Sequence, residues 1–267
     1  MPMKLLGLTI VVGLFGFVGM TATDVKQTLR AELAAHQHSF GYFLADTGVP
    51  PGEVRIVSLE NRTESKVQLK NLQEFTSTEC VSANGRYSLS YQGGIALRDN
   101  QSGETQHLDS DVWFSKQCFS PEDKFVYSTR HTIKIYNVTK KLGADVASGD
   151  YPSWSPDGKW ISFDSGKNVT ILSPESGSRR ALFKTKRRTY STWSPDSRYL
   201  TYTKLGGNGL GLGVIFGRTN CPESYRVWVW RLEDGAHDWV QQICKPGRTF
   251  VWVKTSDLAS QSSAGHE

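Results

Sequence analysis

The chain has 267 residues, of which 21% are charged and 38% hydrophobic, and this balance excludes a disordered chain and a protein with many membrane spans. The net charge of +5 is a mild basic excess and lacks the strongly basic stripe of a dedicated nucleic-acid binder, so we expect no nucleic-acid partner. Aromatic residues make up 11% of the chain, and this favours strands.

The N-terminus has the pattern of an export signal. Lys4 is followed by the uncharged run 5–20 and then by small residues up to Ala22. A basic start, a short apolar stretch and a small residue predict a signal peptide over 1–22, with cleavage after Ala22. We therefore expect a periplasmic or secreted protein with no stable membrane span after signal removal; the alternative is an uncleaved membrane anchor.

A short helix is predicted over 23–38. Val25, Leu29 and Leu33 fall on one side of such a helix, and Thr23 or Asp24 can cap it.

A repeat then runs through the middle of the chain. Its four copies align without gaps at residues 81–87, 119–125, 154–160 and 193–199. The serines of these copies, which are Ser82, Ser120, Ser155 and Ser194, are 38, 35 and 39 residues apart. A four-stranded propeller blade takes about 40 residues.

Each copy has the chemistry of a tight turn between two strands. In Ser155-Pro156-Asp157-Gly158, proline presets φ, aspartate caps its own backbone and glycine accepts positive φ. A basic residue and then an aromatic one follow the turn in all four copies. The serine is thus a turn residue and not a nucleophile.

The remaining segments complete a set of meanders over 39–254. Strands are predicted at 40–45, 54–59 and 66–69 near the start, and 249–253 is left over at the end. If this last strand supplies the missing inner strand of the first blade, the ring closes and has five blades; a degenerate sixth blade is the alternative. Residues 255–267 are predicted to be a disordered tail.

The segment from Trp154 to Phe163 resembles the TolB-type WD-like β-propeller repeat. This resemblance covers residues 80–205 directly and 40–253 by extension, and it implies an all-β propeller with a binding habit. We expect neither of the family's additional domains in this chain: too few residues precede the first strands for the TolB N-terminal domain, and the chain has no Gly-x-Ser-x-Gly elbow of a peptidase domain.

The four cysteines allow three disulfide pairings. Cys221 and Cys244 flank the turn at 233–234, and Cys80 and Cys118 lie at equivalent positions of adjacent blades. We expect these two pairs to form disulfides in an oxidising compartment.

A basic cluster is the candidate partner-binding site. Its residues are Arg179, Arg180, Lys184, Lys186, Arg187 and Arg188. The partner or ligand that it would bind is anionic. A solvated loop is the alternative interpretation. The pattern offers no catalytic residue, no metal ligand and no cofactor site. The glycine loop 205–213 is interpreted as a flexible segment, and a lid or partner-contacting loop is the alternative.

The sequence therefore favours an exported interaction module that binds a protein or peptide partner, without enzymatic activity. The alternative is a hydrolase or lyase that acts on a glycan or peptide in the central channel. A membrane-tethered scaffold is a third hypothesis, which requires that the leader is retained.

Overall fold

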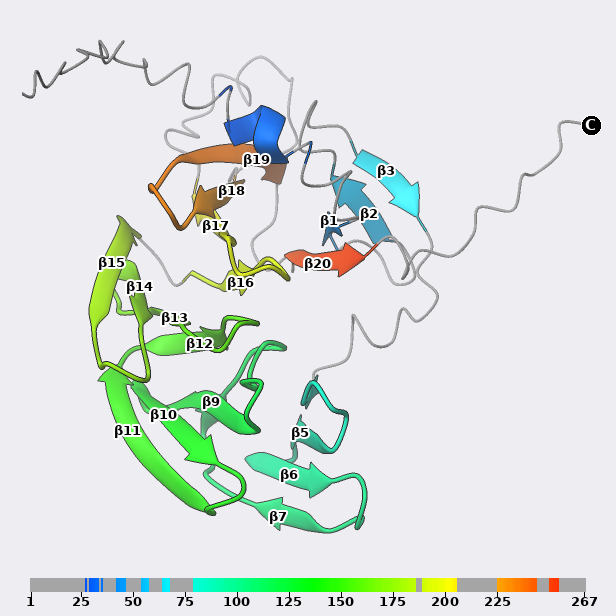
Figure 1. The fold of residues 1–267 in the computed structure, drawn as a ribbon, viewed down its shortest axis with the longest axis vertical. Coiled ribbons are helices and arrows are strands. Elements are labelled where there is room, and N and C mark those ends of the chain that lie inside the picture. The colour runs from blue at the N-terminus through cyan, green and yellow to red at the C-terminus, as the bar shows by residue number, and fades with distance from the viewer. Residues whose placement is uncertain are drawn as a thin grey trace, which may run out of the picture.

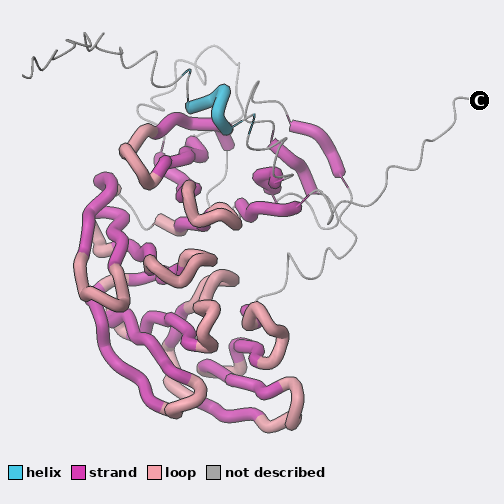
Figure 2. Tube along the Cα trace, viewed as in Figure 1, coloured by secondary structure: helices cyan, strands magenta, loops and turns pink. Residues whose placement is uncertain are grey.

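The computed structural model describes the parts of the chain that form its sheets. These are residues 27, 29–33, 35, 42–46, 54–57, 64–67, 79–185, 189–205, 225–243 and 250–254. The described residues form five four-stranded antiparallel sheets and one short helix (Figures 1 and 2). They contain no helix that is long and apolar enough to cross a membrane.

We number the sheets in chain order and give their strands from the inner to the outer edge. Sheet 1 contains β20 (Phe250–Lys254), β1 (Tyr42–Asp46), β2 (Val54–Val57) and β3 (Glu64–Val67). Sheet 2 contains β4 (Cys80–Val81), β5 (Tyr87–Tyr91), β6 (Ile95–Asp99) and β7 (Thr105–His107). Sheet 3 contains β8 (Val112–Trp113), β9 (Lys124–Thr129), β10 (Thr132–Asn137) and β11 (Leu142–Ser148). Sheet 4 contains β12 (Asp150–Trp154), β13 (Ile161–Asp164), β14 (Asn168–Leu172) and β15 (Arg179–Lys184). Sheet 5 contains β16 (Ser191–Trp193), β17 (Tyr199–Leu205), β18 (Tyr225–Arg231) and β19 (His237–Ile243).

The two ends of the chain meet in sheet 1. Strand β20 pairs antiparallel with β1, from Tyr42 opposite Lys254 to Asp46 opposite Phe250. The sequence predicted this pairing, in which the C-terminal strand supplies the inner strand of the first sheet. Sheets 2 to 5 are each a continuous meander, with strands paired in chain order.

The repeat serines build the turns as their sequence predicted. The Ser155 hydroxyl donates to Asp157 at 2.6 Å and accepts from the Trp160 amide at 2.9 Å, while the Gly158 amide donates to the Ser155 carbonyl. Equivalent bonds join Ser82 to the Tyr87 amide and Ser194 to the Tyr199 amide, both at 2.9 Å. All four repeat serines are buried. Their hydroxyls accept hydrogen bonds from backbone amides in the turn or at the start of the second strand.

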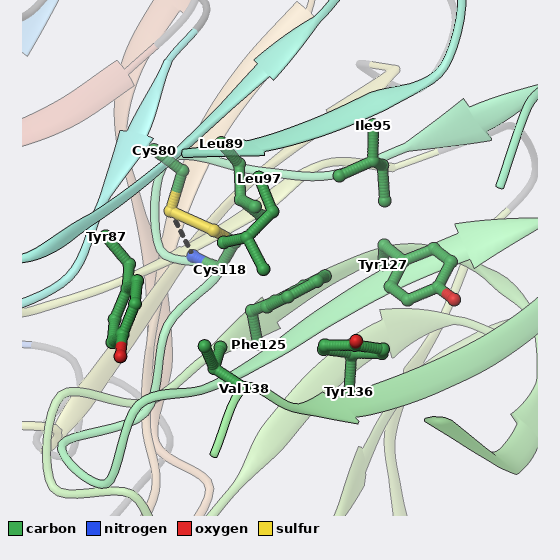
Figure 3. Close-up of a cluster of buried hydrophobic side chains, with 10 residues drawn as sticks. All are labelled: Cys80, Tyr87, Leu89, Ile95, Leu97, Cys118, Phe125, Tyr127, Tyr136 and Val138. Carbon is green, nitrogen blue, oxygen red and sulfur yellow. Dashed lines mark hydrogen bonds between the residues drawn. A yellow bond between two sulfur atoms is a disulfide. The ribbon is translucent and has the colours of Figure 1, made fainter. Parts of the chain in front are cut away.

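Buried side chains join neighbouring sheets side by side along an arc, with β7, β11 and β15 on its outside (Figure 1). Sheets 2 and 3 share a cluster built around the Cys80–Cys118 disulfide and Phe125 (Figure 3). Between sheets 3 and 4, Val126 packs with Trp154. Between sheets 4 and 5, the ring of Phe183 stacks on that of Tyr202, with 3.6 Å between centroids.

Sheet 5 joins sheet 1 through a polar contact. The indole N–H of Trp252 on β20 donates to the Thr201 hydroxyl on β17 at 3.0 Å. Contacts thus link the sheets in the order 2, 3, 4, 5 and 1.

The N-terminal helix, made of the helical residues 27, 29–33 and 35, docks on sheet 5 (Figure 2). Leu29 and Leu33 are fully buried, as expected from their spacing. The Glu32 carboxylate accepts hydrogen bonds from Arg198 at 2.9 Å and from the Tyr199 hydroxyl at 2.6 Å, and it also pairs with Arg231. Arg30 pairs with the buried Asp238 of β19.

Candidate binding site

In an antiparallel meander, successive connections between strands lie alternately at the two ends of the sheet. The repeat turns and the turns between third and fourth strands lie at one end, which we call the turn end. The hairpins between second and third strands and the links from one sheet to the next lie at the other, which we call the crossover end.

Three aromatic rings from three sheets meet at the crossover end. Trp113 lies on β8, Tyr151 on β12 and Tyr190 immediately before β16. The ring centroids of Trp113 and Tyr151 are 4.5 Å apart, those of Tyr151 and Tyr190 4.4 Å, and those of Trp113 and Tyr190 5.2 Å. We call this cluster the aromatic triad.

The triad is partly open to solvent. Trp113 is 37% exposed and Tyr190 47% exposed, whereas Tyr151 is buried at 7%. Tyr91, at the end of β5, adds another exposed ring at this end of the sheets. Large exposed side chains gathered in one place mark an interaction surface, and Trp and Tyr dominate the energetics of such surfaces.

Unusual backbone places the triad. Tyr151 has φ of 55° and Asp111 has φ of 53°, a left-handed conformation that is unfavourable for residues with a Cβ. Gly149 lies two residues before Tyr151, immediately before β12, where a Cβ would lie 2.6 Å from the Asp164 carbonyl oxygen. Such conformations cost about 1–3 kcal/mol each and concentrate at functional sites.

A histidine and a carboxylate stand beside Tyr151. Arg130 and His131 form the two-residue hairpin between β9 and β10, both with positive φ as a type I′ turn requires. The His131 carbonyl accepts from the Gly149 amide at 2.8 Å, and its Nδ1 lies 2.7 Å from Asp150 Oδ2. The His131 side chain is 70% exposed at the crossover end.

Asp164 fixes the backbone that leads to Tyr190. Its carboxylate is 3% exposed and accepts from the Gly166 amide at 2.7 Å and the Thr189 amide at 2.8 Å. A buried carboxylate that accepts backbone N–H bonds holds a loop rigidly. Tyr190 therefore enters the triad from a fixed position.

Gln117 ties three sheets together below the triad. Its side-chain Nε2 donates to the Trp193 carbonyl and its Oε1 accepts from the Trp193 amide, both at 2.8 Å. The same Oε1 accepts from the Ser153 hydroxyl at 3.0 Å, and the Gln117 carbonyl accepts from the Trp154 amide. The inner edges of β12 and β16 are thereby bonded to sheet 3.

A second carboxylate cluster is structural. Asp109 accepts from the Tyr127 hydroxyl at 2.7 Å and pairs with Lys134 at 3.1 Å. The Tyr127 hydrogen bond, followed by that of Lys134, lowers the pKa of Asp109, while burial raises the pKa of Tyr127. Asp109 is thus neutralised by its own neighbours.

The basic cluster is only partly within the described residues. Arg179 and Arg180 lie on the outer strand β15, where they donate to the Val146 carbonyl at 2.6 Å and the Leu232 carbonyl at 2.9 Å. Both guanidinium groups therefore bridge neighbouring sheets. Lys184 ends β15, and Lys186, Arg187 and Arg188 lie outside the described residues, so partner binding by this cluster stays a prediction.

One of the two expected disulfides is confirmed. Cys80 and Cys118 are bonded, with Cα atoms 6.1 Å apart, and the bond lies in the cluster between sheets 2 and 3 (Figure 3). Cys221 and Cys244 lie outside the described residues, as does nearly all of the glycine loop 205–213. Within the described ranges, no group of His, Cys, Asp and Glu is arranged to hold a metal ion.

Sequence reasoning did not find the aromatic triad, although a partial signal was present. Tyr151 and Tyr190 each lie four residues before a repeat serine, whereas Trp113 lies seven before Ser120. A longer link between Trp113 and its repeat turn breaks the equivalence, so a gapless alignment cannot match the three rings.

The described residues thus form four-stranded antiparallel sheets with a cluster of partly exposed aromatic side chains at one end. No family model and no curated protein matches the sequence.

Many solved structures are similar to the chain, and three of them are TolB, an oligogalacturonate lyase and a dipeptidyl peptidase 4. TolB from Acinetobacter baumannii is 15% identical over 75% of this chain and 51% of its own, with a TM-score of 0.48. An oligogalacturonate lyase in complex with manganese is 10% identical over 78% of this chain and 64% of its own, with a TM-score of 0.44. Dipeptidyl peptidase 4 from Porphyromonas gingivalis is 12% identical over 65% of this chain and 34% of its own, with a TM-score of 0.39. The chain thus spans about half of the TolB chain and less than two thirds of the other two.

Proposed function

We propose that this protein is an exported β-propeller interaction module that binds a protein or peptide partner at the crossover end. In this proposal the five sheets are blades, and a junction between sheets 1 and 2 closes the ring. The N-terminal signal pattern and the Cys80–Cys118 disulfide support export to an oxidising compartment.

The observation that carries the proposal is the exposed aromatic triad. Trp113, Tyr151 and Tyr190 come from three sheets, so a rigid scaffold holds the surface that they form. Rigid aromatic anchors contribute large contact area at a low cost in conformational entropy. The backbone at Tyr151 is left-handed and unfavourable, and such conformations concentrate at functional sites, which supports a role for this position.

A capture experiment tests the proposal. The purified mature chain, immobilised, is exposed to an extract of the compartment in which it resides, and bound proteins are identified. We expect a partner that the wild type retains and that the double variant Trp113→Ala, Tyr190→Ala loses. Leu142→Ala is the matched control, because Leu142 is 65% exposed on β11, away from the triad. Equal capture by the double variant and the wild type would refute binding at the crossover end.

One observation favours the alternative, a hydrolase or lyase acting on a glycan or peptide. A histidine whose Nδ1 is held by a carboxylate has the arrangement of a general base, and His131 and Asp150 are so arranged at 2.7 Å. Turnover of peptide or oligosaccharide substrates that disappears in His131→Gln would establish this activity. Turnover unaffected by that substitution would exclude the His131–Asp150 pair as its source.

A further inference from the structure

Two exposed lysines lie at the crossover end of sheet 4. Lys167 belongs to the hairpin between β13 and β14, and Lys184 is the last residue of β15. Neither makes an ion pair within the described residues, whereas Lys124 and Lys134 of sheet 3 each pair with a carboxylate. We call Lys167, Lys184 and the neighbouring Tyr190 the lysine corner.

The buried Asp164 carboxylate joins the hairpin of Lys167 to the segment that carries Tyr190. It accepts a hydrogen bond from the Gly166 amide at 2.7 Å and another from the Thr189 amide at 2.8 Å. Lys167 and Tyr190 are the residues that follow these two amides in the chain. Because one carboxylate binds both backbones, Lys167 and Tyr190 lie on the same part of the surface.

Lys184 is attached to the same hairpin. It lies opposite Asn168 in the pairing of β15 with β14, and the next amide, that of Thr185, donates to the Lys167 carbonyl at 2.9 Å. The sequence 186–188, which lies outside the described residues, contains only basic residues. The two described lysines therefore lie side by side, and the sequence that follows them adds positive charge.

The carboxylates of sheet 4 at this end have partners other than the lysines. Among its described residues at the crossover end, these carboxylates are Asp150 and Asp164. Asp150 lies 2.7 Å from the Nδ1 atom of His131, and Asp164 is 3% exposed and bound by two amides. The described residues at the crossover end of sheet 5 include no aspartate or glutamate. The exposed charges of sheet 4 at this end are therefore the two lysines.

Sheet 3 carries charges of both signs at the crossover end. Asp109 and Asp145 pair with Lys134 at 3.1 Å and 3.8 Å, and Asp111 and Arg130 are both exposed. The positive excess thus belongs to the lysine corner and is not a property of the whole crossover end.

This combination of rings and cations matches an acidic peptide segment. Tyr190 and Trp113 are 47% and 37% exposed and offer contact area to an apolar side chain. The two ammonium groups attract carboxylates and disfavour a basic segment. A nucleic acid fits less well, because the rings of the triad lie 4.4–5.2 Å apart between centroids and leave no gap in which a base can stack between them.

We propose that the lysine corner binds an acidic segment of the partner, with carboxylates at Lys167 and Lys184 and an apolar side chain on the ring of Tyr190. This inference rests on the proposed function and adds to it the chemistry that the partner segment must present. The sequence assigned anionic binding to a cluster that begins with Arg179 and Arg180, but both guanidinium groups bridge neighbouring sheets. Of the described residues in that cluster, Lys184 is the one whose charged group makes no described bond.

Three peptides, labelled with a dye of no net charge, test the charge preference without knowledge of the partner. Each has a central phenylalanine that is flanked on both sides by two glutamates, two glutamines or two lysines. Binding to the full mature chain is measured by fluorescence anisotropy up to millimolar concentration. We expect the glutamate peptide to bind about tenfold more tightly than the glutamine peptide, and added salt to remove this difference. The lysine peptide should bind most weakly.

Matched lysine variants locate the binding. Lys167→Gln and Lys184→Gln should each weaken the glutamate peptide by about two- to fivefold, the effect of one exposed ion pair, and leave the glutamine peptide unchanged. Tyr190→Ala should weaken both peptides. Lys159→Gln is the matched control, because Lys159 is an exposed lysine of the same sheet at its turn end.

Three results overturn the inference while the proposed function stands. Equal affinity for the glutamate and glutamine peptides would show that the corner does not recognise charge. Tighter binding of a single-stranded oligonucleotide with the same charge as the glutamate peptide would assign the corner to nucleic acid. Partner capture that the triad variant loses, but that the double variant Lys167→Gln, Lys184→Gln retains in full, would show that the partner uses the rings without the lysines.

A different result refutes both proposals. If no peptide binds and partner capture is unchanged in the triad variant and in the lysine variants, neither the lysine corner nor the crossover end is the binding surface.

Discussion

Gln117 and Trp193 are 76 residues apart in the sequence, and the side-chain amide of Gln117 hydrogen-bonds the backbone of Trp193. The Gln117 side chain donates to the Trp193 carbonyl and accepts from the Trp193 amide, as a neighbouring strand would. Because inner strands have an unpaired edge, this arrangement satisfies backbone groups that a sheet edge leaves open. One side chain thereby holds the inner strands of sheets 4 and 5 to sheet 3, below the triad.

Gln117→Ala should lower the free energy of unfolding by about 1–3 kcal/mol, because it leaves the Trp193 backbone groups without their partner. The free energy is measured by urea unfolding, followed by tryptophan fluorescence. Gln101→Ala, at an exposed turn, is the control and should leave the midpoint unchanged. If both variants unfold at the wild-type urea concentration, the Gln117 bonds contribute nothing to stability.

The repeat serines should stabilise the fold through their turn hydrogen bonds, and we expect no catalytic role for them. Ser155 is fully buried, and Ser155→Ala removes the acceptor of the Trp160 amide and the donor to Asp157, so it should cost about 1–3 kcal/mol in unfolding free energy. Ser176→Ala in an exposed turn of the same sheet serves as the comparison. If Ser155→Ala is as stable as Ser176→Ala, the Ser155 hydroxyl does not stabilise the turn.

The Cys80–Cys118 bond should stabilise the junction between sheets 2 and 3. It closes a loop with a sequence separation of 38, for which loop entropy predicts about 2–4 kcal/mol. The double variant Cys80→Ala, Cys118→Ala should lose this much unfolding free energy in thermal unfolding. Reductant should then cause no further loss from this pair. An unchanged melting temperature in the double variant would mean that packing alone secures the junction.

The sequence predicted the features of this fold that depend on local chemistry. The Ser-Pro-Asp-Gly turns, the strands that flank them and the Cys80–Cys118 pair follow from residues within one or two repeats. The β20–β1 pairing was also predictable, because the first three strands lacked an inner strand and one strand was left over at the C-terminal end. The triad and the Gln117 bonds were not, because they depend on how three sheets are placed around one another, and on the irregular link between β8 and Ser120.

Stability in acid should depend on Asp234. The hydrogen bond from Arg231 lowers the pKa of Asp234 from 3.8 to about 2 in the folded state. Because the folded-state pKa is the lower one, the stabilisation is complete above the unfolded value and is lost as the pH falls through the window from about 4 to 2. Asp234 is 47% exposed, so the contribution is modest.

The substitution Arg231→Gln should raise the pKa of Asp234 towards its ordinary value and flatten the fall in stability over that window. An NMR titration of the Asp234 carboxyl and urea unfolding at several acidic pH values measure the two effects. Glu175→Gln, at the corresponding turn of sheet 4, is the control. A pKa of Asp234 that does not move in Arg231→Gln would assign the shift to the backbone amide of Ala236 instead.

The N-terminal helix should stabilise sheet 5 through its two buried leucines. Leu29→Ala creates a cavity beneath the helix and should cost about 2–5 kcal/mol, unless the helix detaches first. In that case, the amides of residues 29–33 should exchange hydrogen faster, while those of β9 and β10 keep their protection. Gln27→Ala changes an exposed position of the same helix and controls for helix propensity. Equal exchange in Leu29→Ala and Gln27→Ala would show that the helix is held by Glu32 and its partners Arg198, Tyr199 and Arg231 rather than by its apolar side.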